Sequence, residues 1–126
     1  MSRIRIALIG AAVVALVGIF VGSGLAASKK TAVTTPVVKV SGTEFHFTLS
    51  QKSVPKPGKV IFKFTNNGHE PHNFVFLSGI NKGTPAIAPH KTATLTVTFK
   101  KKGSYTYECT VGEHAEEGML GTFTVK

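Results

Sequence analysis

The chain has 126 residues, of which 42% are hydrophobic, and its 15 lysines and arginines outnumber 6 acidic residues to give a net charge of +9. This length supports one domain and excludes a multidomain enzyme. A single cysteine excludes a framework of internal disulfides, and the absence of glycine-rich phosphate-binding motifs excludes a nucleotide-binding unit.

The first 26 residues differ in composition from the rest of the chain. Arg3 and Arg5 precede an apolar run over residues 6–22, and small residues follow at 23–27. This pattern is typical of a secretory signal peptide, but the run also approaches the length that spans a bilayer, so an N-terminal membrane anchor is the alternative. Both alternatives predict an exported protein, periplasmic or extracellular and, in the second case, attached to a membrane.

The remaining chain divides into a linker and a domain. Residues 27–36 are small, polar and without pattern, which predicts a linker, and residues 37–126 form the predicted domain. In the domain, apolar and polar residues alternate with a period of two, and this indicates strands with one buried face. The apolar positions are Phe45, Phe47, Leu49, Val60, Phe62, Phe64, Phe74, Phe76, Ala93, Leu95, Val97, Phe99, Tyr105, Tyr107, Cys109, Phe123 and Val125.

The spacing of the turns indicates how these strands assemble. Turn signals separate six or seven short strands at intervals of about ten residues, and no helical period is visible. This predicts an all-β fold, an antiparallel β-sandwich. Glycine, proline and asparagine are frequent over residues 78–89, which predicts a long surface loop there.

The single cysteine lies at the end of a predicted strand. Cys109 shares its parity with Tyr105 and Tyr107, so its sulfur is expected on the core side of the strand. One interpretation is a small buried hydrophobe. The other is a metal ligand, because His114 and Met119 follow in a glycine-containing loop and His72 begins another strand.

The donor types select the metal. One thiolate, two imidazoles and a weak thioether suit copper in a trigonal two-His, one-Cys arrangement with a distant Met, whereas zinc sites rarely use Met. Two alternatives concern Met119, which is either a core residue or replaced as ligand by a carboxylate. The candidate carboxylates are Glu113, Glu116 and Glu117.

The stretches Pro71-His72-Asn73-Phe74-Val75 and 107–125 resemble the small blue (type 1) copper proteins, the plastocyanin and azurin cupredoxins. The resemblance implies a Greek-key β-sandwich that binds one copper ion, Cu(I) or Cu(II). It also implies that Asn73 ties the two ligand segments together. The ligands that it implies are His72, Cys109, His114 and Met119.

The ligand loop departs from the pattern of the family. It is longer than the loop of plastocyanin, and Gly112-Glu113 stands where many relatives have Pro-Gly. An acidic side chain at Glu113 is expected to favour oxidised copper and to lower the potential.

The other histidines have less support as ligands. His69 lies three residues before His72, so in an extended chain the two side chains point to opposite faces. His46 alternates onto the polar side of its strand, and His90 precedes a strand in a polar context. All three are predicted to be surface residues.

The interpretation as a copper site favours one-electron transfer as the function. No enzymatic reaction is indicated, because a metal-bound thiolate is not free to act as a nucleophile. The alternative function is copper delivery, storage or resistance in the periplasm. A third reading is a binding module without metal.

The expected partners are a protein redox donor and a protein redox acceptor. The lysine excess favours partners with acidic surfaces, but without clustered arginine it does not indicate nucleic-acid binding. The protein is expected to be a monomer. The resemblance implies that electrons pass at His114 through an apolar patch, for which Ala115 and residues 85–89 are candidates.

Overall fold

The computed structural model of the chain describes residues 27–29 and 31–126. The predicted export segment, 1–26, lies outside the described residues and stays a prediction. The described residues of the predicted linker carry no regular secondary structure and are mostly exposed. Ala32–Lys126 form a compact unit, and among the described residues no helix is long and apolar enough to cross a membrane.

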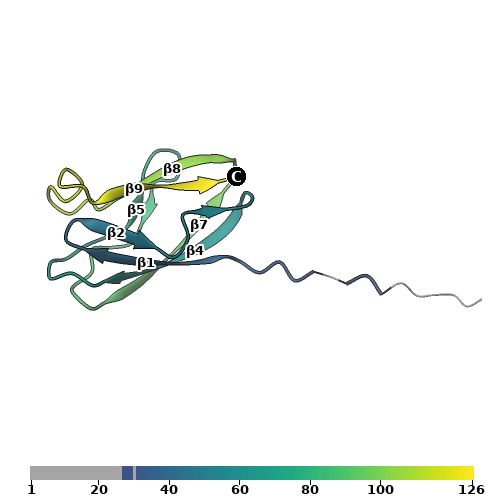
Figure 1. Cartoon of the computed structure of the whole chain (residues 1–126), viewed down its shortest axis with the longest axis horizontal. Coiled ribbons are helices and arrows are strands. Elements are labelled where there is room, and N and C mark those ends of the chain that lie inside the picture. Colours follow the sequence, from purple (N-terminus) through teal and green to yellow (C-terminus); the bar gives the residue numbers. More distant parts are fainter. Residues whose placement is uncertain (1–26, 30) are drawn as a thin grey trace, which may run out of the picture. The chain divides into compact units, whose positions relative to one another are not determined.

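Residues 31–126 contain nine strands arranged in two sheets, which are the two layers visible in Figure 1. The first sheet has the order β2 (His46–Leu49), β1 (Val37–Thr43), β4 (Gly58–Asn66) and β7 (Thr92–Phe99). The second sheet has the order β3 (Ser53–Val54), β9 (Leu120–Val125), β8 (Gly103–Glu108), β5 (Val75–Phe76) and β6 (Lys82–Gly83).

An aromatic core fills the space between the sheets. The predicted alternation is confirmed, because β4 and β7 bury every second residue of their central parts. Many neighbouring rings meet edge to face, as in Phe47 and Phe74, whose centroids lie 5.3 Å apart, and others are stacked, as in Phe99 and Phe123. Such contacts add about 0.5–1.5 kcal/mol per pair beyond the buried area. The fully buried phenylalanines are Phe62, Phe64, Phe74, Phe76, Phe99 and Phe123.

Strand direction differs in part from the prediction. The all-β class is confirmed, but β1 pairs with β4 in parallel, and β3 pairs with β9 in parallel. The physical reason is a crossover: after β2 the chain enters the other sheet at β3 and returns to the far side of β1 as β4. Alternation within a strand reports its buried face and carries no information about its direction.

The predicted surface loop at 78–89 contains ordered structure that the sequence did not indicate. Strand β6 lies within it and pairs with β5, where Gly83 faces Val75 so closely that a Cβ would clash. The buried hydroxyl of Thr84 accepts a hydrogen bond from the Phe74 backbone N–H. The small residues that predicted a loop therefore allow a short edge strand to pack closely.

Candidate metal centre

Three side chains from distant parts of the chain converge at one end of the sandwich. The Nδ1 atoms of His72 and His114 lie 3.0 Å apart, and the Cys109 Sγ lies 3.9 Å from the first and 3.5 Å from the second. These three donor atoms all lie within 4.8 Å of one another. The structure thus brings together three of the four side chains that the sequence predicted as ligands.

Cys109 is placed by the strand that precedes it. It follows the last residue of β8, and its side chain is fully buried, as its parity with Tyr107 predicted. Its backbone N–H donates to the carbonyl of Met119 at 2.9 Å. This bond joins the two ends of the loop over residues 109–119, which we call the cysteine loop.

The cysteine loop is closed by its own backbone. The Met119 N–H donates to the His114 carbonyl at 2.9 Å, and the His114 N–H donates to the Val111 carbonyl at 3.1 Å. Gly112 and Gly118 adopt positive φ angles of 51° and 108°, which cost glycine little. The loop therefore folds back so that the His114 ring returns to the sulfur of Cys109.

The segment over residues 66–73, which we call the histidine segment, carries the fully buried His72. His72 exchanges two backbone hydrogen bonds with Ile87, of 3.2 and 2.8 Å. The buried side chain of Asn66 donates to the carbonyls of Glu70 and Ile87 and accepts from the Gly68 N–H. The histidine segment is thus held by hydrogen bonds of the Asn66 side chain and by the backbone of Ile87, which is distant in the sequence.

Asn73 connects the two regions, as the resemblance implied. Its Nδ2 donates to the Thr110 hydroxyl, and its Oδ1 accepts from the Thr110 backbone N–H, both at 2.8 Å. The predicted role of Asn73 is confirmed.

Met119 is fully buried, and its methyl carbon lies against the position where Gly42 has no side chain. Its backbone carbonyl accepts a hydrogen bond from the Cys109 N–H, and its backbone N–H donates one to the His114 carbonyl. The carboxylates that were the alternative to Met119 belong to residues that are all exposed, Glu113, Glu116 and Glu117. The role of Met119 as the fourth ligand stays a prediction.

The sequence analysis missed two carboxylates that contact the histidines. Glu44 Oε1 lies 3.2 Å from His72 Nε2, and Glu70 Oε2 lies 3.0 Å from His114 Nε2. Glu113, which was expected to act on the site, is exposed on the cysteine loop instead. No local sequence pattern indicates that Glu44 contacts a histidine, because Glu44 lies in the turn between β1 and β2. Glu70 stands two residues before His72, and this proximity was its only signal.

The backbone holds the Glu44 carboxylate in place. The N–H groups of Glu70 and His69 donate to its Oε1, and they lower its pKa well below the usual range for a carboxyl group, with a smaller contribution from His72. Gly68 leaves room for this arrangement, because a Cβ there would overlap the Glu44 carboxylate and lie 2.9 Å from His72 Nε2.

The three remaining histidines lie on the surface, as predicted. His46 and His90 are exposed, and the side chain of His69 is 94% exposed, with its Nδ1 3.5 Å from Glu44 Oε2. The aromatic residue beside the site is Phe45, whose ring packs edge-on against His114 at 5.1 Å. Phe45 was predicted to lie on a strand, but it lies in the turn between β1 and β2, where its partly buried ring packs beside the site.

The donor set fits a single metal ion. Bond lengths of about 2.0–2.1 Å to nitrogen and about 2.3 Å to sulfur, as in zinc sites, separate trigonal donors by about 3.5–3.8 Å. The observed separations of 3.0, 3.5 and 3.9 Å lie close to these values. In addition, both Nε2 atoms face carboxylates, so both Nδ1 lone pairs face the site, where a cation would satisfy them.

Comparison with known proteins agrees with this architecture. Residues 12–125 match the family described as the cupredoxin-like domain. A search of curated proteins finds no significant match.

Several solved structures share the fold. Reduced auracyanin from the photosynthetic bacterium Roseiflexus castenholzii superposes with a TM-score of 0.63 at 22% identity and covers 74% of this chain and 98% of its own. Auracyanin A, a "blue" copper protein from Chloroflexus aurantiacus, gives 0.60 at 18% identity, with coverage of 74% and 100%. An azurin from Methylomonas sp. strain J gives 0.56 at 18% identity, with coverage of 74% and 99%.

Proposed function

The chain belongs to the cupredoxin-like domain family, and from this premise we propose that it is an exported copper protein that transfers single electrons between redox partners. The observation that carries the proposal is the convergence of His72 Nδ1, His114 Nδ1 and Cys109 Sγ at one buried point. The comparisons support it, because a structure with the same fold is described as a blue copper protein.

The donor chemistry favours copper over zinc. In a copper site, Cys109 would supply a thiolate, His72 and His114 would supply imidazole nitrogens, and Met119 is the proposed weak fourth ligand. Bound copper would supply a one-electron couple, Cu(I)/Cu(II), that accepts an electron from a donor and passes it to an acceptor. The surrounding protein determines whether this exchange is fast.

The chain holds its donors in place before any ion binds. The cysteine loop is closed by its own backbone, and the two bonds between Asn73 and Thr110 fix it relative to the histidine segment. Donors that are held in one geometry need to move little when the charge of the site changes, which favours electron transfer. Burial of Cys109 also protects its sulfur from solvent oxidants.

His114 is the donor that a partner approaches most closely. Its side chain is 11% exposed, whereas Cys109 and His72 are fully buried. The half-buried Ala115 and Ile87 belong to the predicted apolar patch. We therefore place the contact with redox partners at this end of the sandwich.

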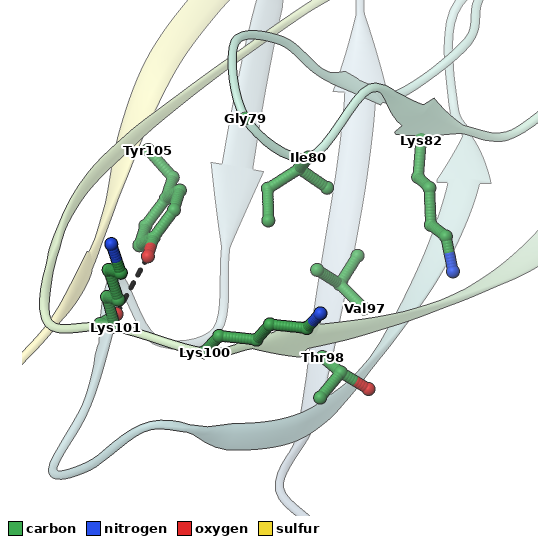
Figure 2. A pocket seen from close by; sticks show the side chains of 8 residues that line it. All are labelled: Gly79, Ile80, Lys82, Val97, Thr98, Lys100, Lys101 and Tyr105. Carbon is green, nitrogen blue, oxygen red and sulfur yellow. Dashed lines mark hydrogen bonds between the residues drawn. The ribbon is translucent and has the colours of Figure 1, made fainter.

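Acidic partners are part of the proposal. The chain carries a net charge of +9, which raises the rate of encounter with acidic surfaces. Figure 2 shows one pocket whose lining includes the basic side chains Lys82, Lys100 and Lys101 and the apolar side chains Ile80 and Val97. Lys100 and Lys101 lie in the turn before β8, whereas Cys109 follows the other end of β8. These two lysines therefore act by long-range steering rather than by contact at the metal site.

We propose export on the basis of the sequence pattern of residues 1–26, which is interpreted either as a cleaved signal peptide or as a membrane anchor. The periplasm or the extracellular space is the proposed location. A monomer is proposed, with no catalytic reaction of its own.

The experiment adds Cu(II) to the purified protein and records its visible spectrum. We expect an intense thiolate-to-copper absorption band at one copper ion per chain, and its complete loss in Cys109→Ser. Thr110→Ser is the matched control beside the site, because it keeps the hydroxyl group that Asn73 uses. Absence of the band in the native protein with its thiol reduced would refute the proposal.

A second measurement separates electron transfer from copper delivery. Small redox agents should reduce and reoxidise the bound copper reversibly in stopped-flow experiments, with no copper lost to a chelator on the same timescale. A carrier for delivery or storage would instead release copper to the chelator faster than it exchanges electrons.

A further inference from the structure

Each histidine of the site has a carboxylate on its outer nitrogen. Glu44 Oε1 lies 3.2 Å from Nε2 of His72, and Glu70 Oε2 lies 3.0 Å from Nε2 of His114. Both contacts occur on the ring nitrogen opposite the Nδ1 that faces the site. Two histidines from distant segments thus each have a carboxylate on the ring nitrogen that faces away from the site.

We propose that Glu44 and Glu70 are positioning residues that orient the two histidine ligands and favour Cu(II) over Cu(I), thereby lowering the reduction potential of the site. This inference rests on the proposed function, because it concerns how the same site holds copper. It goes beyond that function because it assigns the control of the potential to two particular carboxylates.

The orientation follows from hydrogen bonding. An ionised carboxylate only accepts hydrogen bonds, so it selects the histidine tautomer that carries its proton on Nε2. The Nδ1 atoms of His72 and His114 then keep the lone pairs with which they bind a metal. A carboxylate partner also makes the imidazole a stronger donor to the ion.

Glu44 is fixed by its surroundings. It accepts from two backbone N–H groups in addition to the contact with His72, and its side chain is only 29% exposed. Gly68 provides the space, because any side chain there would collide with the carboxylate. The charge of Glu44 therefore stays beside His72 in both oxidation states of the site.

The lysines do not neutralise these carboxylates. Within residues 27–29 and 31–126, no lysine lies within ion-pair distance of Glu44 or Glu70, and the close nitrogen partners of both carboxylates are histidine rings. Two uncompensated negative charges stabilise Cu(II) more than Cu(I), because the oxidised ion carries the larger charge. This lowers the potential relative to the same site without them.

The charges of Glu44 and Glu70 should differ in how strongly they affect the reduction potential. The Glu70 side chain is 55% exposed, whereas that of Glu44 is 29% exposed, so solvent and salt screen Glu70 more. We expect the effect of Glu70 to shrink at high salt and the effect of Glu44 to persist.

The test measures Cu(II) affinity, Cu(I) affinity and midpoint potential for Glu44→Gln and Glu70→Gln. Glutamine keeps an oxygen that accepts the same hydrogen bonds, so the substitution removes the charge alone. For Glu44→Gln, we expect Cu(II) affinity to fall about 10-fold relative to Cu(I) affinity, because partners of metal ligands contribute 10–100-fold. That ratio raises the potential by about 59 mV for one electron. Glu70→Gln should shift the potential in the same direction by less.

Glu113→Gln is the matched control. It removes the same charge one residue from His114, but its side chain is exposed and is not among the hydrogen-bond or ion-pair partners of His72 and His114. A shift for Glu44→Gln no larger than that for Glu113→Gln would overturn the proposal.

Gly68→Ala tests the contact without changing any charge. The added methyl group must displace the Glu44 carboxylate from His72 Nε2. We expect the potential to rise as in Glu44→Gln, and an unchanged potential would contradict the role of the contact.

A measurement on the metal-free protein separates this inference from the proposed function. Nitrogen NMR of the imidazole rings should show a proton on Nε2 of both His72 and His114. This result would support the positioning role even if the thiolate-to-copper band were absent. An unprotonated Nε2 on either histidine would overturn the positioning role even if the band were present.

Discussion

The cysteine loop and the histidine segment deliver donors to the same point by different means. In the cysteine loop, backbone bonds join Cys109, His114 and Met119, which are at most ten residues apart. In the histidine segment, His72 depends on Ile87 and on Glu44, which lie 15 and 28 residues away in the chain. The first region is organised locally, and the second is organised by the fold.

This difference predicts how the site responds to substitution. Damage to the histidine segment removes contacts that also join distant elements, so it should destabilise the whole domain. Damage to the cysteine loop should destabilise the domain less, because the backbone bonds of this loop join residues that are close in the chain. The predictions below test the contrast, in order of decreasing expected effect.

The largest effect is expected for Asn66→Ala in the histidine segment. The substitution leaves the Glu70 and Ile87 carbonyls and the Gly68 N–H without their buried partner. Each unsatisfied group costs about 1–3 kcal/mol, so we expect the free energy of unfolding to fall by about 3 kcal/mol or more. The measurement is urea denaturation of the metal-free protein.

Asn67→Ala provides the control for Asn66. Asn67 is exposed, and its side chain makes one hydrogen bond, to Ser41. Its loss should cost about 1 kcal/mol or less. Equal losses for the two variants would show that the histidine segment does not depend on the buried amide.

A smaller effect is expected for Gly112→Ala in the cysteine loop. Gly112 has a φ angle of 51°, and a Cβ there meets no atom within 4 Å, so the cost is purely conformational. We expect the free energy of unfolding to fall by about 1–2 kcal/mol, the cost of the left-handed region for an L-residue. Thermal and urea denaturation both report it.

Gly112→Asn sharpens this prediction, because asparagine tolerates the left-handed region better than alanine. It should recover part of the lost stability. If the Gly112→Ala variant is as stable as the native protein, the positive φ angle at this position does not require glycine.

The smallest effect is expected where the two regions meet. Thr110→Val removes the hydroxyl that accepts from Asn73 Nδ2 but keeps the backbone N–H that donates to Asn73 Oδ1. We expect a loss of about 0.5–1.5 kcal/mol in the free energy of unfolding, measured by urea denaturation. Thr110→Ser should behave like the native protein, and a loss of the same size in both variants would argue against this bond.

Several features of the site could be predicted from the sequence because they are local. The parity of Cys109 with Tyr107 predicted the burial of its sulfur, and both are buried. The spacing of Cys109, His114 and Met119 predicted a loop that folds back, and the backbone bonds of the loop confirm this. These predictions depend only on neighbours in the chain.

Other features could not be predicted because they join distant residues. Glu44 is 28 residues from His72, and nothing in either stretch reveals their contact. The parallel pairing of β1 with β4 and the edge strand β6 depend on how the two sheets are connected. Alternation of side chains contains no information about either.

By itself, the sequence predicted the all-β class and the burial of the thiol, because these follow from periodicity, and its resemblance to the blue copper proteins pointed to the three side chains that converge. The tertiary structure alone decided which carboxylates face the histidines, how far apart the three donor atoms lie, and which strands pair in parallel. The physical reason is that short-range patterns fix the direction in which a side chain points, whereas only the packing of two sheets fixes what it meets there.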